Sequence, residues 1–398
     1  MKELLKNLIR AKSTLDTGEI KCANVLADFF RSAGIKPNVE VWNKTRANIT
    51  VRIKSTGKKP ALLFVSHLDV VPAQQAGAFE PIERGGKIFG RGACDMKGGI
   101  TSVAVAMAEI LHSKVKLQGD VIFTATAGEE TDSAGVKKFL KSQKTWPKFA
   151  GIIVPEPTNF DLVYAHRGLL WLQIITKGKS AHSSMPQLGI NAIDSMKMFL
   201  NKLENFKIPG VNKLLGKASI SVNKIIGGSA ANIVPDLCSV QIDIRTIPGQ
   251  KTSWIVGEIN KILARLSKQN PRFQADLKVL RDSGSLQTDE KCEFVKRSKQ
   301  ILNKHLTAVP FTTDAPYLTV FKSPIVIFGP GKPQLCHKPG EYIDIKDLKK
   351  AVELTKKLFC TFWADSFTRL SGSVAPEYPG HLRPYCRWDS ASSQMNYS

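Results

Sequence analysis

Carboxylates and imidazoles recur in this sequence where a strand-like run of apolar residues has just ended. His67 and Asp69 close the run ALLFVSHLD, and Glu129 and Glu130 follow DVIFTATA. Residues two apart on a strand project to the same face, so a carboxylate can hold the second ring nitrogen of a metal-bound imidazole. Adjacent carboxylates repel one another unless a cation or a proton intervenes. In isolation, each pattern is explained as readily by a solvated histidine or a solvated acidic loop.

Three further candidates stand in turn-rich segments. Asp95 lies in GRGACDMKGG, directly before a helix-like stretch, where the roles of helix N-cap and metal ligand are equally open. Glu156 stands between two prolines in VPEPT, and His337 lies in the loop GPGKPQLCHKPGEYI. Two histidines and three carboxylates near strand ends indicate two adjacent nitrogen/oxygen sites, of the kind that zinc prefers in catalysis. Cys94 and Cys336 neighbour proposed ligands, and we predict that their side chains point away from the metals.

The elements that must position these residues alternate along the first part of the chain. Strand-like runs are predicted at 47–53, 61–67, 120–127 and 151–156, and the apolar stretch 98–111 predicts a buried helix. Strands that alternate with helices predict an α/β fold, with a mostly parallel sheet covered by helices on both faces. Ligand sites in such sheets lie outside the carboxyl ends of the strands, where the candidate residues fall.

The pattern changes near residue 170. A strand, a helix, two strands and a second helix are predicted in that order, which is typical of a small α+β domain with an antiparallel sheet. We therefore predict a catalytic domain in two parts, residues 1–170 and 291–361, interrupted by an inserted domain at 171–290. Residues 362–398 are rich in Ser, Pro, Arg and Tyr and predict an irregular tail.

Composition limits the class of protein. The net charge of +23 comes from lysines spread along exposed helix faces without a nucleic-acid-binding motif, so we interpret it as a basic surface that attracts anionic substrates. No apolar run is long enough to predict a membrane span, and the N-terminal residues predict an amphipathic helix rather than a signal peptide. Seven cysteines without a CxxC pair argue against a disulfide framework. We expect a cytoplasmic protein with no nucleic-acid and no membrane partner.

In combination, the segments SHLDVVP, GRGACDMKGG, AGEET, PEPT and CHKPGEY resemble motifs of a known family. It is the family of dinuclear-zinc metallopeptidases and aminoacylases, which includes acetylornithine deacetylase and succinyl-diaminopimelate desuccinylase. The resemblance covers residues 3–360 and implies two Zn²⁺ ions, for which Co²⁺ or Mn²⁺ are possible substitutes. It also implies that the inserted domain is a lid and dimerisation domain, and that the protein is a homodimer.

The resemblance assigns a role to each motif residue. Asp95 is expected to bridge the two metals, and the two sites are completed by His67 with Glu156 and by Glu130 with His337. Glu129 is expected to act as the general base, and Asp69 is expected to hold the second ring nitrogen of His67. A cis peptide bond is expected between residues 95 and 96.

Motifs in the inserted domain add three residues to this set. GKSAHSSMPQ implies that His182 polarises the scissile carbonyl group, supplied by the partner subunit in dimeric members of the family. GGSAANIVPD and IDIRTIPG imply that Asn232 and Arg245 grip the substrate carboxylate, for which the planar fork of arginine is suited. A surface position at a strand edge is the alternative for Arg245.

We therefore expect zinc-dependent hydrolysis of an N-acyl amide, acetyl or succinyl, of an amino acid. TTDAPYL at 312–318 resembles the acetylornithine deacetylase branch, which points to amino-acid biosynthesis. The first alternative is a dipeptidase or carboxypeptidase of the same family, acting on a small dipeptide. A basic nucleic-acid-binding protein and a binding module without catalysis are alternatives of other classes.

Overall fold

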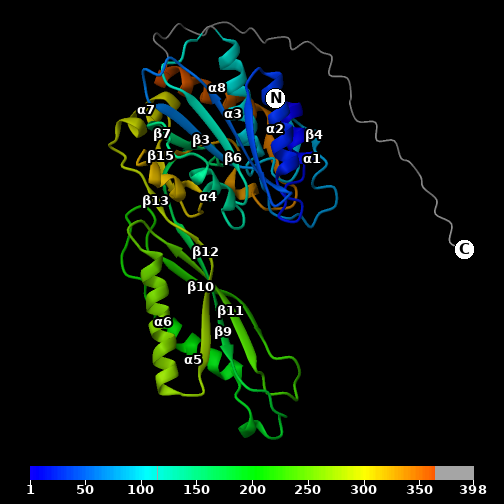
Figure 1. Cartoon of the computed structure of the whole chain (residues 1–398), viewed down its shortest axis with the longest axis vertical. Helices are drawn as coiled ribbons and strands as arrows, with labels where there is room; N and C mark the ends of the chain where they lie inside the picture. Colours follow the sequence, from blue (N-terminus) through cyan, green and yellow to red (C-terminus); the bar gives the residue numbers. More distant parts are fainter. Residues whose placement is uncertain (114, 364–398) are drawn as a thin grey trace, which may run out of the picture. The chain divides into compact units, whose positions relative to one another are not determined.

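The strands that end at the candidate ligands lie in one sheet of nine strands (Figure 1). This computed structural model describes residues 1–113 and 115–363. The strands are β1 (Pro37–Trp42), β2 (Arg46–Ile53), β3 (Ala61–His67), β6 (Val121–Thr126), β7 (Phe149–Val154), β8 (Leu162–His166), β13 (Leu286–Gln287), β14 (Leu306–Val309) and β15 (Ile325–Ile327). Their order is β1-β2-β6-β3-β7-β15-β8-β13, with β14 paired to β8. The central pairs, from β6 to β15, are parallel, and antiparallel pairs flank them on both sides.

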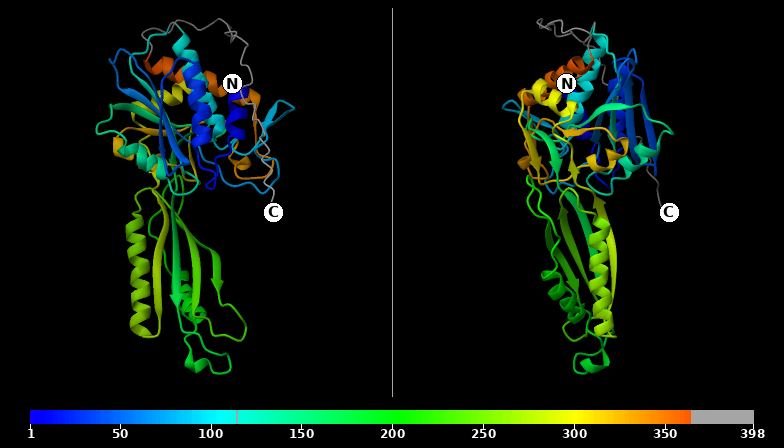
Figure 2. Two further views of the ribbon diagram at one scale, coloured as in Figure 1. Left: turned by 45° about the vertical axis from the view of Figure 1, so that its right-hand side comes forward. Right: turned by 90° about the vertical axis from the view of Figure 1, so that its left-hand side faces the viewer.

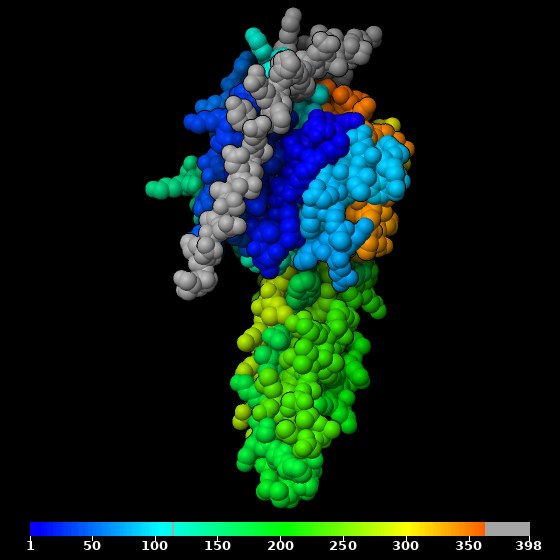
Figure 3. Space-filling view, turned by 90° about the vertical axis from the view of Figure 1, so that its right-hand side faces the viewer, coloured from blue at the N-terminus to red at the C-terminus, as the bar shows by residue number. Residues whose placement is uncertain are grey.

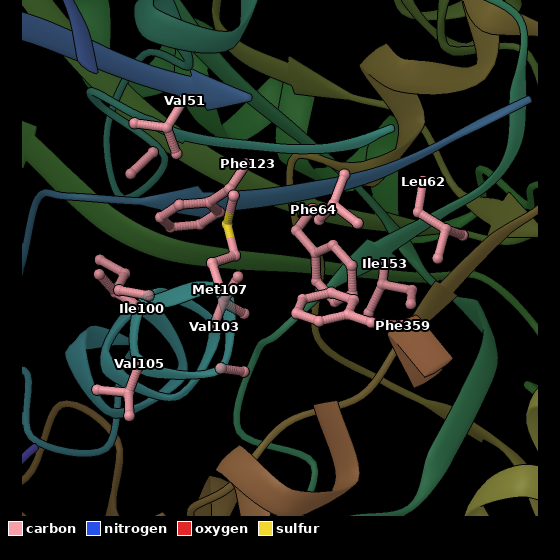
Figure 4. Close-up of a cluster of buried hydrophobic side chains, with 14 of the residues drawn as sticks. Val51, Leu62, Phe64, Ile100, Val103, Val105, Met107, Phe123, Ile153 and Phe359 are labelled. Carbon is pink, nitrogen blue, oxygen red and sulfur yellow. The ribbon is translucent and has the colours of Figure 1, made fainter. Parts of the chain in front are cut away.

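Helices cover both faces of this sheet, because its central strands are apolar on both faces. In β3, Leu62 and Phe64 point to one face and Leu63 and Val65 to the other. The first face packs against helices α2 (Ile20–Ser32), α3 (Lys97–His112), α7 (Glu293–Leu302) and α8 (Ile345–Trp363). Figure 4 shows α3 and Phe359 of α8 against the strand side chains. The second face packs against α4 (Ala134–Lys141) and the 3-10 helix η2 (Ala315–Phe321).

The N-terminal helix α1 (Lys2–Arg10) packs against a small sheet, β16-β5-β4. Its strands are β4 (Ile82–Arg84), β5 (Lys87–Phe89) and β16 (Tyr342–Asp344). Leu5 and Ile9 of the helix form one cluster with Ile88 and Ile343, which confirms the predicted amphipathic helix. Figure 3 shows the dark-blue N-terminal residues beside the light-blue segment that carries β4 and β5.

A second sheet is antiparallel throughout and has the order β10-β11-β9-β12 (Figure 2). Its strands are β9 (Gly168–Lys177), β10 (Ser219–Gly227), β11 (Leu237–Thr246) and β12 (Gln274–Ser283). Helices α5 (Ala192–Glu204) and α6 (Thr252–Gln269) pack on one face of this sheet and share a single apolar cluster with it. β12 was not predicted from the sequence, although Ala275, Leu277 and Val279 alternate with polar residues as in a strand with one covered face.

The predicted fold class is confirmed, with a parallel centre in the large sheet and a separate α+β part. The predicted boundaries of the inserted domain stay a prediction, and β13, at Leu286–Gln287, already belongs to the large sheet. Of the tail predicted at 362–398, residues 362 and 363 extend α8, and the others lie outside the described residues. Within the described ranges, no helix is long and apolar enough to cross a membrane.

Candidate metal centre and active site

The five residues predicted to bind metals meet at one edge of the large sheet. His67 is the last residue of β3, Glu130 and Glu156 follow β6 and β7, and His337 follows β15. Asp95 lies in the turn directly before α3. Because β3, β6, β7 and β15 run parallel, their carboxyl ends bring these loops together.

The Asp95 carboxylate lies between two imidazoles. Its Oδ1 is 3.3 Å from Nε2 of His67, and its Oδ2 is 3.2 Å from Nε2 of His337. The imidazole of His67 is also 3.6 Å from Oε1 of Glu156, and that of His337 is 2.8 Å from Oε1 of Glu130. Two groups of side chains therefore share one carboxylate, an arrangement suited to two neighbouring cations.

The electrostatics of this cluster call for added positive charge. Burial raises the pKa of Glu130, and it raises the pKa of Glu156 to about 7. Burial opposes ionisation of Asp95 too, but hydrogen bonds from His337 and His67 lower the pKa of that carboxyl below its usual range. Hydrogen bonds to the carboxylates raise the pKa of His337 to about 10. Nitrogen and oxygen donors held this closely, three of them within 4.8 Å of one another, fit divalent metal ions.

Asp69 holds the loop that carries the paired glutamates. Its Oδ1 accepts the main-chain N–H groups of Gly128 and Glu129, at 2.8 and 3.0 Å, and its Oδ2 accepts that of Glu130 at 2.9 Å. The Nδ1 of His67 hydrogen-bonds the main-chain oxygen of Asp69 at 3.0 Å, whereas the nearest carboxylate oxygen is 3.6 Å away. Asp69 thus contacts His67 mainly through its main-chain oxygen. Its carboxylate orients the loop that carries Glu129 and Glu130.

Glu129 is buried beside the cluster. Burial raises the pKa of Glu129 well above its usual range, and the nearby His67 acts in the opposite direction. A raised pKa suits a carboxyl group that accepts and returns a proton near neutral pH. The guanidinium of Arg281, a residue that the sequence reasoning did not single out, lies 3.3 Å from Oε1 of Glu129.

Glu341 and Arg91 form a buried clasp that sequence reasoning also missed. Oε1 of Glu341 accepts the main-chain N–H groups of Cys94 and Asp95, at 2.9 and 3.0 Å. Arg91 donates to Oε2 of Glu341 at 2.7 Å and to the main-chain oxygen of His337 at 3.3 Å. The clasp therefore joins the turn that carries one candidate ligand to the loop that carries another. The only sequence signal was the place of Glu341 in the CHKPGEY motif.

One prediction about the turn at Asp95 is confirmed, and the orientation predicted for the side chains of Cys94 and Cys336 stays a prediction. The peptide bond between Asp95 and Met96 is cis, as expected. The sulfur atoms of Cys94 and Cys336 lie 3.9 Å apart, close to each other and to the main-chain oxygen of Lys332.

The structure does not bring the three inserted-domain residues to the cluster. His182 is exposed and pairs through Nδ1 with Ser184. A β-bridge between residues 182 and 233 places it beside Asn232, which is also exposed. The guanidinium of Arg245 is bound in a fork by Asp243, with contacts of 2.7 and 3.0 Å. The roles expected for these residues stay predictions.

Comparison with known proteins identifies the family. Residues 63–360 match the model of "Peptidase family M20/M25/M40". The chain belongs to this family. This chain is 30% identical over 308 residues to an acetylornithine deacetylase of Myxococcus xanthus. The alignment covers 75% of this chain and 80% of the relative. A "probable succinyl-diaminopimelate desuccinylase" of Staphylococcus aureus (strain MSSA476) is 28% identical over 396 residues, covering 89% and 95%.

A solved structure gives the same fold at greater sequence distance. The M20 family metallo-carboxypeptidase Sso-CP2 of Sulfolobus solfataricus is 19% identical to this chain. The two structures superpose with a TM-score of 0.76, over 90% of this chain and 98% of the carboxypeptidase. The predicted family resemblance and the predicted enzyme class are confirmed. The M20-family protein is a metal-dependent hydrolase.

Proposed function

We propose that this hydrolase is a dinuclear zinc amidohydrolase that removes an acetyl or succinyl group from an N-acyl amino acid. The observation that carries the proposal is the Asp95 carboxylate, whose two oxygens face His67 and His337 at 3.3 and 3.2 Å. The similarity to a deacetylase and a desuccinylase supports the acyl amide as the bond cleaved. TTDAPYL favours the acetyl group.

The residues divide the work as follows. Two zinc ions, when bound, would be held by His67, Asp95, Glu130, Glu156 and His337, and they would supply Lewis acidity and lower the pKa of bound water to about 7. Glu129 accepts the proton of the attacking water on its carboxylate and returns it to the nitrogen of the leaving amine. Its side chain is buried beside the cluster.

The inserted domain completes the proposed reaction. His182 stabilises the oxyanion that forms on the acyl carbonyl, as an N–H donor at a developing charge. Asn232 and Arg245 bind the carboxylate of the amino-acid part, which requires Arg245 to exchange Asp243 for the substrate. The proposal includes a homodimer and a cytoplasmic location, with which the unpaired state of the six described cysteines is consistent.

A substrate panel tests the proposal. Metal-depleted and zinc-restored enzyme is incubated with N-acetyl and N-succinyl amino acids and with dipeptides, and the released amines are quantified. We expect zinc-dependent release from an N-acetyl amino acid that carries a free carboxylate. Zinc-dependent cleavage of dipeptides alone would instead assign the protein as a dipeptidase or carboxypeptidase. Equal release with and without metal would overturn the role of the cluster.

A further inference from the structure

Arg281 is a buried cation on β12, and the register of this strand directs its side chain toward Glu129. β12 pairs with β9, and a β-bulge between Val279 and Arg281 shifts the pairing so that Arg281 lies opposite Trp171. Bulges near active sites commonly re-aim a side chain. The Arg281 guanidinium lies 5.6 Å from the centroid of the Trp171 ring, and its side chain is only 9% exposed.

Trp171 is fixed from its other side. β11 pairs with β9 so that Asp243 lies opposite Trp171, and the indole Nε1 donates to Oδ2 of Asp243 at 2.9 Å. Asp243 also accepts two hydrogen bonds from Arg245. A row of contacts therefore runs across three adjacent strands, from Arg245 through Asp243 and Trp171 to Arg281. These contacts within the four-stranded sheet support the Arg281 side chain on the side of Trp171.

The row ends on Glu129. Nη2 of Arg281 donates to the main-chain oxygen of Glu129 and lies 3.3 Å from its Oε1. On the other side, the main-chain N–H of Glu129 is held by Asp69 at 3.0 Å. Among the residues that the structure describes, Arg281 is the only hydrogen-bond donor to the Glu129 carboxylate. The direction in which that carboxylate points therefore depends on Arg281.

A purely stabilising role does not account for these surroundings. The Nε of Arg281 has no hydrogen-bond partner within residues 1–113 and 115–363, and a buried unpaired donor costs stability. An apolar side chain of similar size would avoid that cost. A guanidinium offers what an apolar side chain lacks, which is a rigid plane of donors that fixes a carboxylate.

We propose that Arg281 is a positioning residue that orients the Glu129 carboxylate for proton transfer, and that the four-stranded sheet acts on the reaction through it. The inference rests on the proposed role of Glu129 as general base. Arg281, which lies on the four-stranded sheet, would thus act on the proposed active site at the edge of the large sheet.

Kinetics of variants in the full-length zinc-loaded enzyme test this role, with the substrate that the panel shows to be cleaved fastest. We expect Arg281→Ala to lower kcat about 100-fold, because a misplaced group costs that much, while KM changes less than about 3-fold. Arg281→Lys keeps the charge without the planar fork and should also lower kcat. Added methylguanidine should restore part of the kcat of Arg281→Ala. Lys278→Ala, which removes an exposed cation from the same strand, is the matched control and should leave kcat and KM unchanged.

Thermal unfolding gives a readout that is independent of turnover. The Tm shifts of Glu129→Gln and Arg281→Ala should not add in the double variant, because contacting residues are coupled. Additive shifts, or a kcat of Arg281→Ala within about 3-fold of wild type, overturn the inference, and so does a loss in KM alone. If Arg281→Ala does not fold, the kcat of Arg281→Lys decides. Near-native activity of Glu129→Ala would refute the proposed general base itself, whatever the Tm shifts show.

Discussion

Glu341 holds the main chain of the turn that carries Asp95, the residue proposed to bind both metal ions. Its carboxylate accepts the main-chain N–H groups of Cys94 and Asp95 and pairs with Arg91. We expect Glu341→Gln to weaken zinc binding about 10- to 100-fold, because groups that orient metal ligands have effects of that size. Zinc titration of the metal-depleted variant measures the change. Asp344→Asn, a half-buried change on β16, is the control, and an unchanged affinity in Glu341→Gln would contradict the positioning role.

Glu129 is the residue on which the proposed proton transfer depends. Glu129→Ala should lower kcat at least about 100-fold, the lower range for loss of a general base, while two zinc ions per chain remain bound. Steady-state kinetics and metal analysis of the same preparation measure both quantities. The exposed Glu80→Ala is a matched control. Loss of zinc together with activity would make Glu129 a structural part of the metal site instead.

At the scale of elements, helix α5 begins with an N-cap residue, Asn191, of a type that commonly caps helices. The side chain of Asn191 accepts the N–H groups of Ile193 and Asp194, at 2.8 and 3.3 Å. Removing such a cap costs about 1 kcal/mol of unfolding free energy. We expect Asn191→Ala to show this loss in urea denaturation, whereas Asn201→Ala, at an exposed position of the same helix, should not. Equal stability of the two variants would show that packing of α5 on the sheet makes the cap dispensable.

The elements also show what a sequence can predict. β3 and α3 were predictable because their apolar runs are continuous, and both are buried. β12 was not predicted, although Ala275, Leu277 and Val279 alternate with polar residues, because the strand it pairs with, β9, lies far away in the sequence. The same reason hides Arg281, whose neighbours Trp171 and Glu129 are more than a hundred residues away in the sequence. The convergence of the candidate ligands was predictable because parallel strands bring their carboxyl ends to one edge of the sheet, whereas the roles of His182 and Arg245 rest on the resemblance alone.

At the scale of the whole molecule, His166 makes stability depend on pH. It is buried at the end of β8, where Nδ1 donates to the main-chain oxygen of Arg167 at 2.7 Å and Nε2 accepts from Thr313 at 3.2 Å. Burial lowers the pKa of His166 to about 4, against a usual value of about 6.5. Between these two values the unfolded chain binds a proton that the folded chain does not, so stability falls as the pH falls from 6.5 to 4.

His166→Asn isolates this effect. Asparagine keeps a donor near the position of Nδ1 but does not titrate, so the variant should lack the His166 part of the acid destabilisation. That part amounts to about 3 kcal/mol across the window, at 1.36 kcal/mol for each pH unit. The measurement is the difference in unfolding free energy between wild type and variant at pH 7 and at pH 4. The difference should move in favour of the variant on acidification. A constant difference would mean that His166 takes up its proton in the folded protein as readily as in the unfolded chain.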